Sequence, residues 1–171
     1  MKIEDALAGI VDDNLRACVA EAASGMQQVS EVTELNCARR QVSALNGLSG
    51  LTNLTTLVLH DNQITDISGL SGLTNLTDLS LRSNQITDVS GLSGLTNLTQ
   101  LHLGYNRITD VSPLSGLTLS GLTKLWWLDL RFNNISDLSG IALASESKQG
   151  LFYWRLDNNN ISDLSPLKGL A

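Results

Sequence analysis

A repeat of 22 residues runs through this sequence and constrains its fold more than any other feature. Residues 51–72 read LTNLTTLVLHDNQITDISGLSG, and residues 73–94 and the segment that begins at residue 95 repeat this block almost unchanged. Two weaker copies begin at Leu122 and Gly150. A repeat of this length is typical of a solenoid, in which each copy folds as one unit and buries its apolar face only against its neighbours.

A degenerate copy precedes the clear ones. It begins at Val29, 22 residues before Leu51, and fills every apolar position of the repeat, although Arg40 stands where the later copies carry asparagine. We therefore expect a single structural domain, with an N-terminal cap over residues 1–28 and about six repeats over residues 29–171.

Each repeat contains the pattern Leu-x-Leu, which is too short for a helix and alternates with a period of two. This predicts a short strand whose leucines face the core, and successive strands then form one parallel sheet. An asparagine follows each strand, where its amide can satisfy backbone groups at the turn. This ladder comprises Asn62, Asn84, Asn106, Asn133 and Asn159. The aspartates expected to cap short 3₁₀ turns later in each repeat are Asp66, Asp88, Asp110, Asp137 and Asp163.

Two segments predict helices. In the cap, Asp13 is expected to be the N-cap of a helix that ends near Gly25. The apolar stripe of this helix consists of Leu15, Cys18, Val19 and Ala22. Residues 141–150, which are inserted before the last repeat, contain Ala, Glu and Lys and predict a short helix on the outer face.

The repeat, written LxxLxxLxLxxNxIxDIxxLxx, resembles the leucine-rich repeat superfamily and specifically the 22-residue class found in bacterial internalins. The segments DDNLRACVAEAASG and EVTELNC resemble the N-terminal cap of internalin-like proteins. This resemblance implies an α/β repeat solenoid that is right-handed and curved, with a parallel β-sheet on its concave face and an N-terminal helical cap. It also implies an adhesin-like protein, secreted or at the bacterial cell surface, with the cytoplasm as the alternative.

Two cysteines occur in the chain. Cys37 occupies an inward position of the first repeat, and Cys18 lies on the apolar stripe of the cap helix. The two side chains can therefore face each other as a disulfide that joins the cap to the first repeat. The alternative is two free thiols that pack as small apolar core residues.

The outward strand positions define the candidate binding site. Aromatic and arginine side chains gather there in the C-terminal half, which is the composition of an interaction hot spot. We expect a partner protein to bind this concave face. The expected apolar anchors are Trp127, Tyr153, Tyr105 and Phe132, and the expected polar contacts are Arg131, Arg155, Asp129 and His102. The cluster could instead serve self-association or plain packing, in which Trp126 and Phe152 shield the edge of the core.

Two other functions compete with recognition. The last repeat has no predicted covering element, which suggests a scaffold that assembles or dimerises through this end or through the aromatic patch. Regular threonine rows resemble ice-binding surfaces and predict ice or surface binding as a minor alternative. These rows are Thr52, Thr74 and Thr96; Thr55, Thr77 and Thr99; and Thr65, Thr87 and Thr109. Glycosylation sequons recur at the repeat period and are attributed to the template; they lie at Asn53, Asn75, Asn97, Asn134 and Asn160.

Composition and motifs exclude several classes of function. A formal net charge of −6 disfavours binding to nucleic acid. No apolar run approaches the roughly 20 residues of a membrane-spanning helix, so we expect no membrane insertion, and carboxylates in the N-terminal segment predict no secretory signal. Nucleophile, phosphate-loop and metal-ligand motifs are missing. We therefore expect neither enzymatic activity nor a cofactor nor a bound metal.

Overall fold

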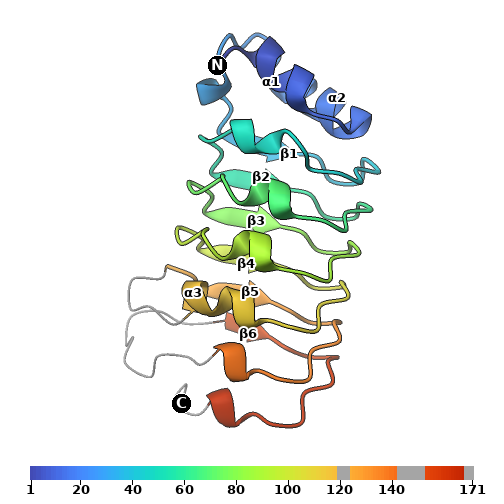
Figure 1. The fold of residues 1–171 in the computed structure, drawn as a ribbon, viewed down its shortest axis with the longest axis vertical. Coiled ribbons are helices and arrows are strands. Elements are labelled where there is room, and N and C mark those ends of the chain that lie inside the picture. The colour runs from blue at the N-terminus through green and yellow to red at the C-terminus, as the bar shows by residue number, and fades with distance from the viewer. Residues whose placement is uncertain (119–123, 142–152, 168–171) are drawn as a thin grey trace.

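The computed structural model describes residues 1–118, 124–141 and 153–167, which form a stack of short strands with two helices at the N-terminal end (Figure 1). The strands belong to one sheet of six, in the order of the sequence, and all pair in parallel. They are β1 (Glu34–Asn36), β2 (Thr56–Val58), β3 (Asp78–Ser80), β4 (Gln100–His102), β5 (Trp127–Asp129) and β6 (Tyr153–Arg155). The predicted α/β repeat solenoid with an N-terminal helical cap is confirmed.

The repeat period determines the register of the sheet. Leu35, Leu57 and Leu79 pair in sequence with one another, and all three are buried. The register survives both the insertion at residues 141–150 and a duplication of LSGLT at residues 114–123, because Trp127 still pairs with Gln100 on one side and with Tyr153 on the other. Since side chains alternate across a strand, the leucines fill the core and their neighbours face the solvent.

Short 3₁₀ turns lie opposite the sheet and complete each repeat. They are Val29–Glu31, Leu48–Gly50, Ser68–Leu70, Ser90–Leu92, Ser112–Leu114, Ser139–Ile141 and Ser165–Leu167, and the helical turn α3 (Ser115–Thr118) follows the fifth of them. The predicted aspartate caps are confirmed: the Asp66 carboxylate accepts a hydrogen bond of 2.8 Å from the Ser68 N–H group. The corresponding bonds run from Ser90 to Asp88, Ser112 to Asp110, Ser139 to Asp137 and Ser165 to Asp163.

The asparagine ladder connects consecutive repeats, as predicted. The side-chain amide of Asn84 donates to the carbonyl oxygens of Leu81 and Leu59, each at 3.0 Å, and its Oδ1 atom accepts from the Ile64 N–H group at 3.0 Å. Asn62, Asn106, Asn133 and Asn159 repeat this arrangement. Each ladder residue therefore satisfies buried backbone groups on two repeats.

A second asparagine ladder lies at the first three sequons. The Asn75 side chain donates to the Thr52 carbonyl oxygen at 2.9 Å, and Asn53 and Asn97 make the equivalent bonds to Ser30 and Thr74. These residues belong to the repeat template, as predicted, and their role within it is to hold neighbouring repeats together.

The cap consists of α1 (Ile3–Gly9) and α2 (Asp13–Ala22). The prediction that Asp13 caps the second helix is wrong by one residue: Asp12 is the N-cap, and it accepts a hydrogen bond of 2.9 Å from the Leu15 N–H group. Asp12 is favoured as the N-cap because its carboxylate also accepts hydrogen bonds from the Ser43 N–H and hydroxyl groups, which belong to the first repeat. The helix predicted over residues 141–150 lies almost wholly outside the described residues.

The cap is joined to the first repeat by a disulfide between Cys18 and Cys37, which confirms that prediction. Arg40 explains the degenerate character of this repeat. In place of the ladder asparagine, its guanidinium donates to both carboxylate oxygens of Glu21 on α2, at 3.1 and 2.7 Å. Gly47 is required here as well, because it has a φ of +90° and a Cβ atom would lie 2.1 Å from the Gly9 carbonyl oxygen.

Replacing Asp12 with Ala is expected to destabilise the cap by about 1–2 kcal/mol, the usual cost of losing an N-cap. Burial opposes ionisation of Asp12, but hydrogen bonds from Ser43, Leu15 and Ala44 outweigh it and hold its pKa below 3.8. A carboxylate with a lowered folded-state pKa stabilises the fold above the unfolded value, and this contribution is lost as the pH falls through the folded value. The acid-induced loss of stability below about pH 4 should therefore be smaller in Asp12→Ala when urea unfolding is followed against pH.

The control for this experiment is Asp13→Ala, which removes the neighbouring carboxylate. Asp13 pairs with Arg16 at the surface and accepts no bond from the first repeat in the described chain. It is expected to change stability little. Equal effects of the two substitutions would contradict the assignment of Asp12 as the residue that docks the cap.

Candidate functional site

The predicted aromatic residues meet on the solvent-facing side of the sheet. This side is called the sheet face below and is defined by the outward side chains of β1–β6 and of the three residues after each strand. Trp127 and Tyr153 are register partners on β5 and β6, and their rings stack 4.4 Å apart at an angle of 12°. The His102 ring on β4 lies 5.8 Å from Trp127. Trp126 meets Trp127 edge-on at 6.1 Å.

A second stack lies just beyond the ends of the strands. The rings of Tyr105 and Phe132 are 4.3 Å apart and nearly parallel. Both residues have a positive φ, of 59° and 53°, which turns their side chains at the same point of consecutive repeats. The guanidinium groups of Arg82 and Arg131 lie over the Tyr105 ring, at 4.8 and 5.6 Å from its centre. The second stack is therefore flanked by cations, and the two stacks on the sheet face are together called the aromatic region below.

Arg82 is the member of this region that the sequence analysis missed. It lies 23 positions before Tyr105, which is one repeat plus one residue. That spacing places two side chains diagonally on adjacent repeats, so it is the signal that could have identified Arg82.

Several of these aromatic rings are open to solvent. Tyr153 is 53% exposed, and Trp126, Phe132 and Tyr105 are 42%, 40% and 37% exposed. Exposed aromatic side chains that cluster in this way are typical of binding surfaces. Trp154 points to the other side of β6, where it is partly buried and packs against the core.

Asp129 departs from its expected role as an accessible polar contact. It is 2% exposed, its Oδ1 atom accepts from the Arg131 N–H group, and its Oδ2 atom lies 3.1 Å from Arg131 Nε. Space for its carboxylate exists because Gly104 on the adjacent repeat lacks a side chain: a Cβ atom there would lie 3.0 Å from Asp129 Oδ1. Asp129 therefore lies beneath Arg131 and holds its guanidinium in position. Arg155 lies on the open side, with its Nε atom 3.9 Å from Asp157.

His102 occupies the centre of the sheet face. Burial lowers its pKa, and the carboxylates of Asp129 and Asp78 offset this only in part, so the imidazole is neutral at pH 7. No group of three or more His, Cys, Asp and Glu side chains in the described ranges is arranged to hold a metal ion.

The threonine rows and the C-terminal repeat, on which the ice-binding and self-association predictions depend, lie outside the aromatic region. The hydroxyls of Thr55, Thr77 and Thr99 donate to carbonyl oxygens of the preceding repeat, at 3.0–3.1 Å, so this threonine row stabilises the stack. Leu151 of the last repeat lies outside the described residues, while Leu164 of the same repeat is 60% exposed. Self-association through this end stays a prediction.

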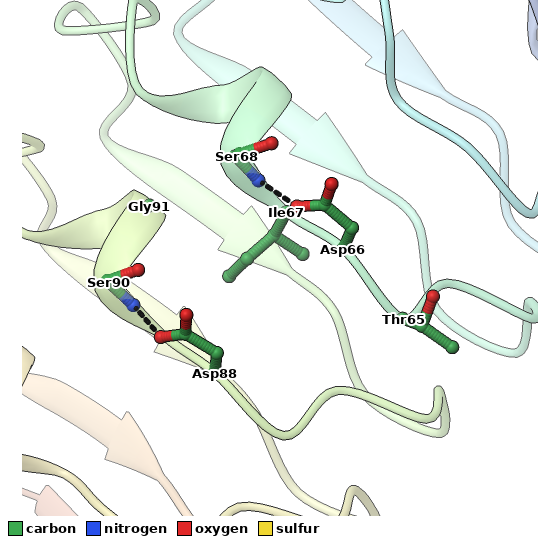
Figure 2. Close-up of a pocket in the computed structure, with 7 residues that line it drawn as sticks. All are labelled: Thr65, Asp66, Ile67, Ser68, Asp88, Ser90 and Gly91. Atoms are coloured by element: carbon green, nitrogen blue, oxygen red, sulfur yellow. Dashed lines mark hydrogen bonds between the residues drawn. The ribbon is translucent and has the colours of Figure 1, made fainter.

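A small hollow lies among the turns on the opposite side of the molecule (Figure 2). It measures about 250 Å³ and is lined by Thr65, Asp66, Ile67, Ser68, Asp88, Ser90 and Gly91. Its carboxylates accept the capping hydrogen bonds of Ser68 and Ser90, which Figure 2 shows as dashed lines. We attribute this hollow to the turn architecture.

Comparison with known proteins agrees with the geometry. A family model described as leucine-rich repeats in two copies matches residues 30–72 and 74–116, and a single-repeat model matches residues 122–144. No curated protein sequence matches the chain. In the described residues, no helix is both long enough and apolar enough to span a bilayer.

Solved structures of bacterial proteins are similar over most of the chain. The internalin InlF of Listeria monocytogenes is 33% identical over 96% of this chain and 48% of its own, with a TM-score of 0.82. Internalin C2 of the same species is 32% identical over 96% of this chain and 82% of its own, with a TM-score of 0.65. A leucine-rich repeat protein of Leptospira interrogans is 27% identical over 76% of this chain and 32% of its own, with a TM-score of 0.60. The chain thus spans about half the length of the InlF structure. It belongs to the leucine-rich repeat family and is an internalin-like bacterial member of it.

Proposed function

We propose that this chain is a non-enzymatic recognition module that binds a partner protein through the sheet face. The observation that carries the proposal is the pair of exposed aromatic stacks, Trp127 with Tyr153 and Tyr105 with Phe132. Rings that already stack on one another lose little side-chain freedom when a partner covers them, so most of the buried apolar area contributes to affinity.

Cations at the rim support a protein partner. Arg82, Arg131 and Arg155 border the aromatic region, and a guanidinium can donate to carboxylates and backbone carbonyls of a partner. Aromatic anchors with arginine around them are the composition of binding hot spots.

The proposed setting is the bacterial cell surface or the secreted fraction. The Cys18–Cys37 disulfide supports this, because such bonds persist in oxidising environments outside the cytoplasm. The absence of enzymatic activity is part of the proposal. Its support is the openness of the sheet face, since catalysis needs a site that excludes water around the reacting groups.

Panning a display library of random peptides against the immobilised chain tests this proposal. Selected peptides are expected to bind the double variant Trp127→Ala, Tyr153→Ala about tenfold or more weakly than the wild type, because each ring provides a hot-spot contact. Affinities would be measured by biolayer interferometry, with circular dichroism to show that the variant is folded.

The matched control is Val11→Ala with Leu164→Ala, which truncates two exposed apolar side chains away from the sheet face. This variant is expected to bind like the wild type. A library that yields no binders, or binders that lose equal affinity for both variants, would exclude the sheet face as the recognition surface.

A further inference from the structure

A hollow in the N-terminal half of the sheet face is separate from the aromatic stacks. It measures about 330 Å³. Its lining residues are Thr56, Leu57 and Val58 of β2, Asp78, Leu79 and Ser80 of β3, and His102 of β4. Ligand pockets for small molecules begin at roughly 300 Å³, so this space suits one long side chain better than a cofactor.

Asp78 gives the hollow a negative charge. None of the ion pairs in the described chain involves this carboxylate, whereas Asp61, which lies beyond the end of β2, pairs with Arg39. The Asp78 Oδ2 atom lies 2.9 Å from the Thr77 hydroxyl, whose single proton is shared with the Thr55 carbonyl oxygen. Because His102 is neutral at pH 7, Asp78 is the charged group among the lining residues.

His102 contributes an aromatic ring to the lining of the hollow. His102 lines the hollow on one side and packs against Trp127 on the other, at 5.8 Å between ring centres. A carboxylate and an aromatic ring in one hollow favour a cation, and a guanidinium uses both, by hydrogen bonding at its edge and by stacking with its plane. A divalent metal ion would need several carboxylate or carbonyl ligands, and the hollow offers one carboxylate.

We infer that this hollow binds the cationic side chain of an arginine or lysine of the partner protein. The inference rests on the proposed function and adds the chemistry of the partner. Neighbouring strands are about 4.8 Å apart, so the hollow on β3 and the ring of Trp127 on β5 are separated by roughly 10 Å. An extended peptide covers this distance in about three residues. The partner segment therefore carries a basic residue about three positions from an apolar one.

A small probe tests this inference without the partner. N-acetyl-arginine amide is titrated into the ¹⁵N-labelled chain, and amide shifts are followed by NMR. We expect saturable shifts of Val58, Ser80 and His102, which line the hollow. N-acetyl-citrulline amide, which has nearly the same shape without the charge, should produce shifts about fivefold smaller at equal concentration, the effect of one lost charge contact.

Two variants assign the effect to the hollow. Asp78→Asn keeps the shape and is expected to weaken binding of the arginine probe about fivefold. Glu34→Gln is the control, because Glu34 lies in the same column of the sheet, through Thr56, but does not line the hollow. Spectra of both variants away from β2–β4 should match the wild type, which shows that they are folded.

The inference is overturned if the two probes shift the same amides equally, if Asp78→Asn binds like the wild type, or if Glu34→Gln loses as much affinity. Its failure is distinct from that of the proposed function. Peptides that bind at Trp127 and Tyr153 but show no basic residue and no sensitivity to Asp78→Asn would support the recognition surface and reject the cation pocket.

Discussion

Replacing Asn106 with Ala is expected to lower the free energy of unfolding by about 3 kcal/mol, as measured by urea denaturation. Asn106 is 7% exposed, and its amide donates to the carbonyl oxygens of Leu81 and Leu103 at 3.1 and 3.0 Å. Its Oδ1 atom accepts from the Ile86 N–H group at 3.0 Å. Truncation leaves these backbone groups on two repeats buried without hydrogen-bond partners. Each such group costs about 1–3 kcal/mol, and relaxation of the surrounding structure offsets part of this cost.

The matched control is Asn75→Ala in the second asparagine ladder. Asn75 is exposed and makes one bond, to Thr52, so water can replace its amide and the expected loss is about 1 kcal/mol. Asn106→Asp keeps an acceptor but buries a charge in place of the donor, and it should destabilise at least as much as Asn106→Ala. Similar losses for Asn75→Ala and Asn106→Ala would contradict the view that burial makes the first ladder essential.

The periodic features of the fold were predictable because each depends on local sequence that recurs. The pairing of Leu57 with Leu79 follows from the repeat period alone, and so does the position of each ladder asparagine. Stacking copies of one unit leaves no freedom in register, since a slip of one residue would turn the leucines outward. The aspartate caps were predictable for the same reason, because Asp66 and Ser68 are two residues apart.

Features that depend on one particular neighbour could not be predicted. Asp129 occupies an outward position but is buried, because Arg131 folds back over it and Gly104 leaves room for it. The choice of Asp12 over Asp13 as the helix cap depends on donors that are about 30 residues away in the sequence. In both cases the deciding contact joins two repeats, or a repeat and the cap, at positions that do not recur.

The candidate site was predicted in outline for a related reason. Its aromatic residues occupy outward columns that the period defines, so their approach across strands was expected and is seen in the stacks of Trp127 on Tyr153 and Tyr105 on Phe132. The hollow beside Asp78 was not anticipated. Its shape comes from small side chains on β2 and β3 next to the large ring of His102. The repeat period shows which side chains face outward, but it does not show how deep the surface is between them.

Removal of the disulfide by Cys18→Ala with Cys37→Ala is expected to cost about 3 kcal/mol, the chain-entropy value for a bridge that closes a loop of this size. The two cysteines are 19 residues apart and join α2 to the end of β1. Contacts in a solenoid connect nearest neighbours, so the loss should concentrate in the cap and the first repeat. Hydrogen exchange should show early loss of protection in α2, while the amides of β3 and β4 stay protected.

Reduction of the wild type under native conditions should reproduce the double variant, because both treatments remove the same constraint. Glu21→Gln provides the comparison at the same interface: it breaks the exposed pair with Arg40 but leaves the covalent bond, and a much smaller effect is expected. Two titratable thiols in the oxidised, denatured chain, or identical unfolding of wild type and double variant, would reject the bridge as the element that holds the cap.

Loss of the cap should also expose the first repeat. Without the cap, the edge of β1 and the buried side chains of Val32 and Leu35 lose the cover that α2 provides, and an open strand edge of this kind promotes aggregation.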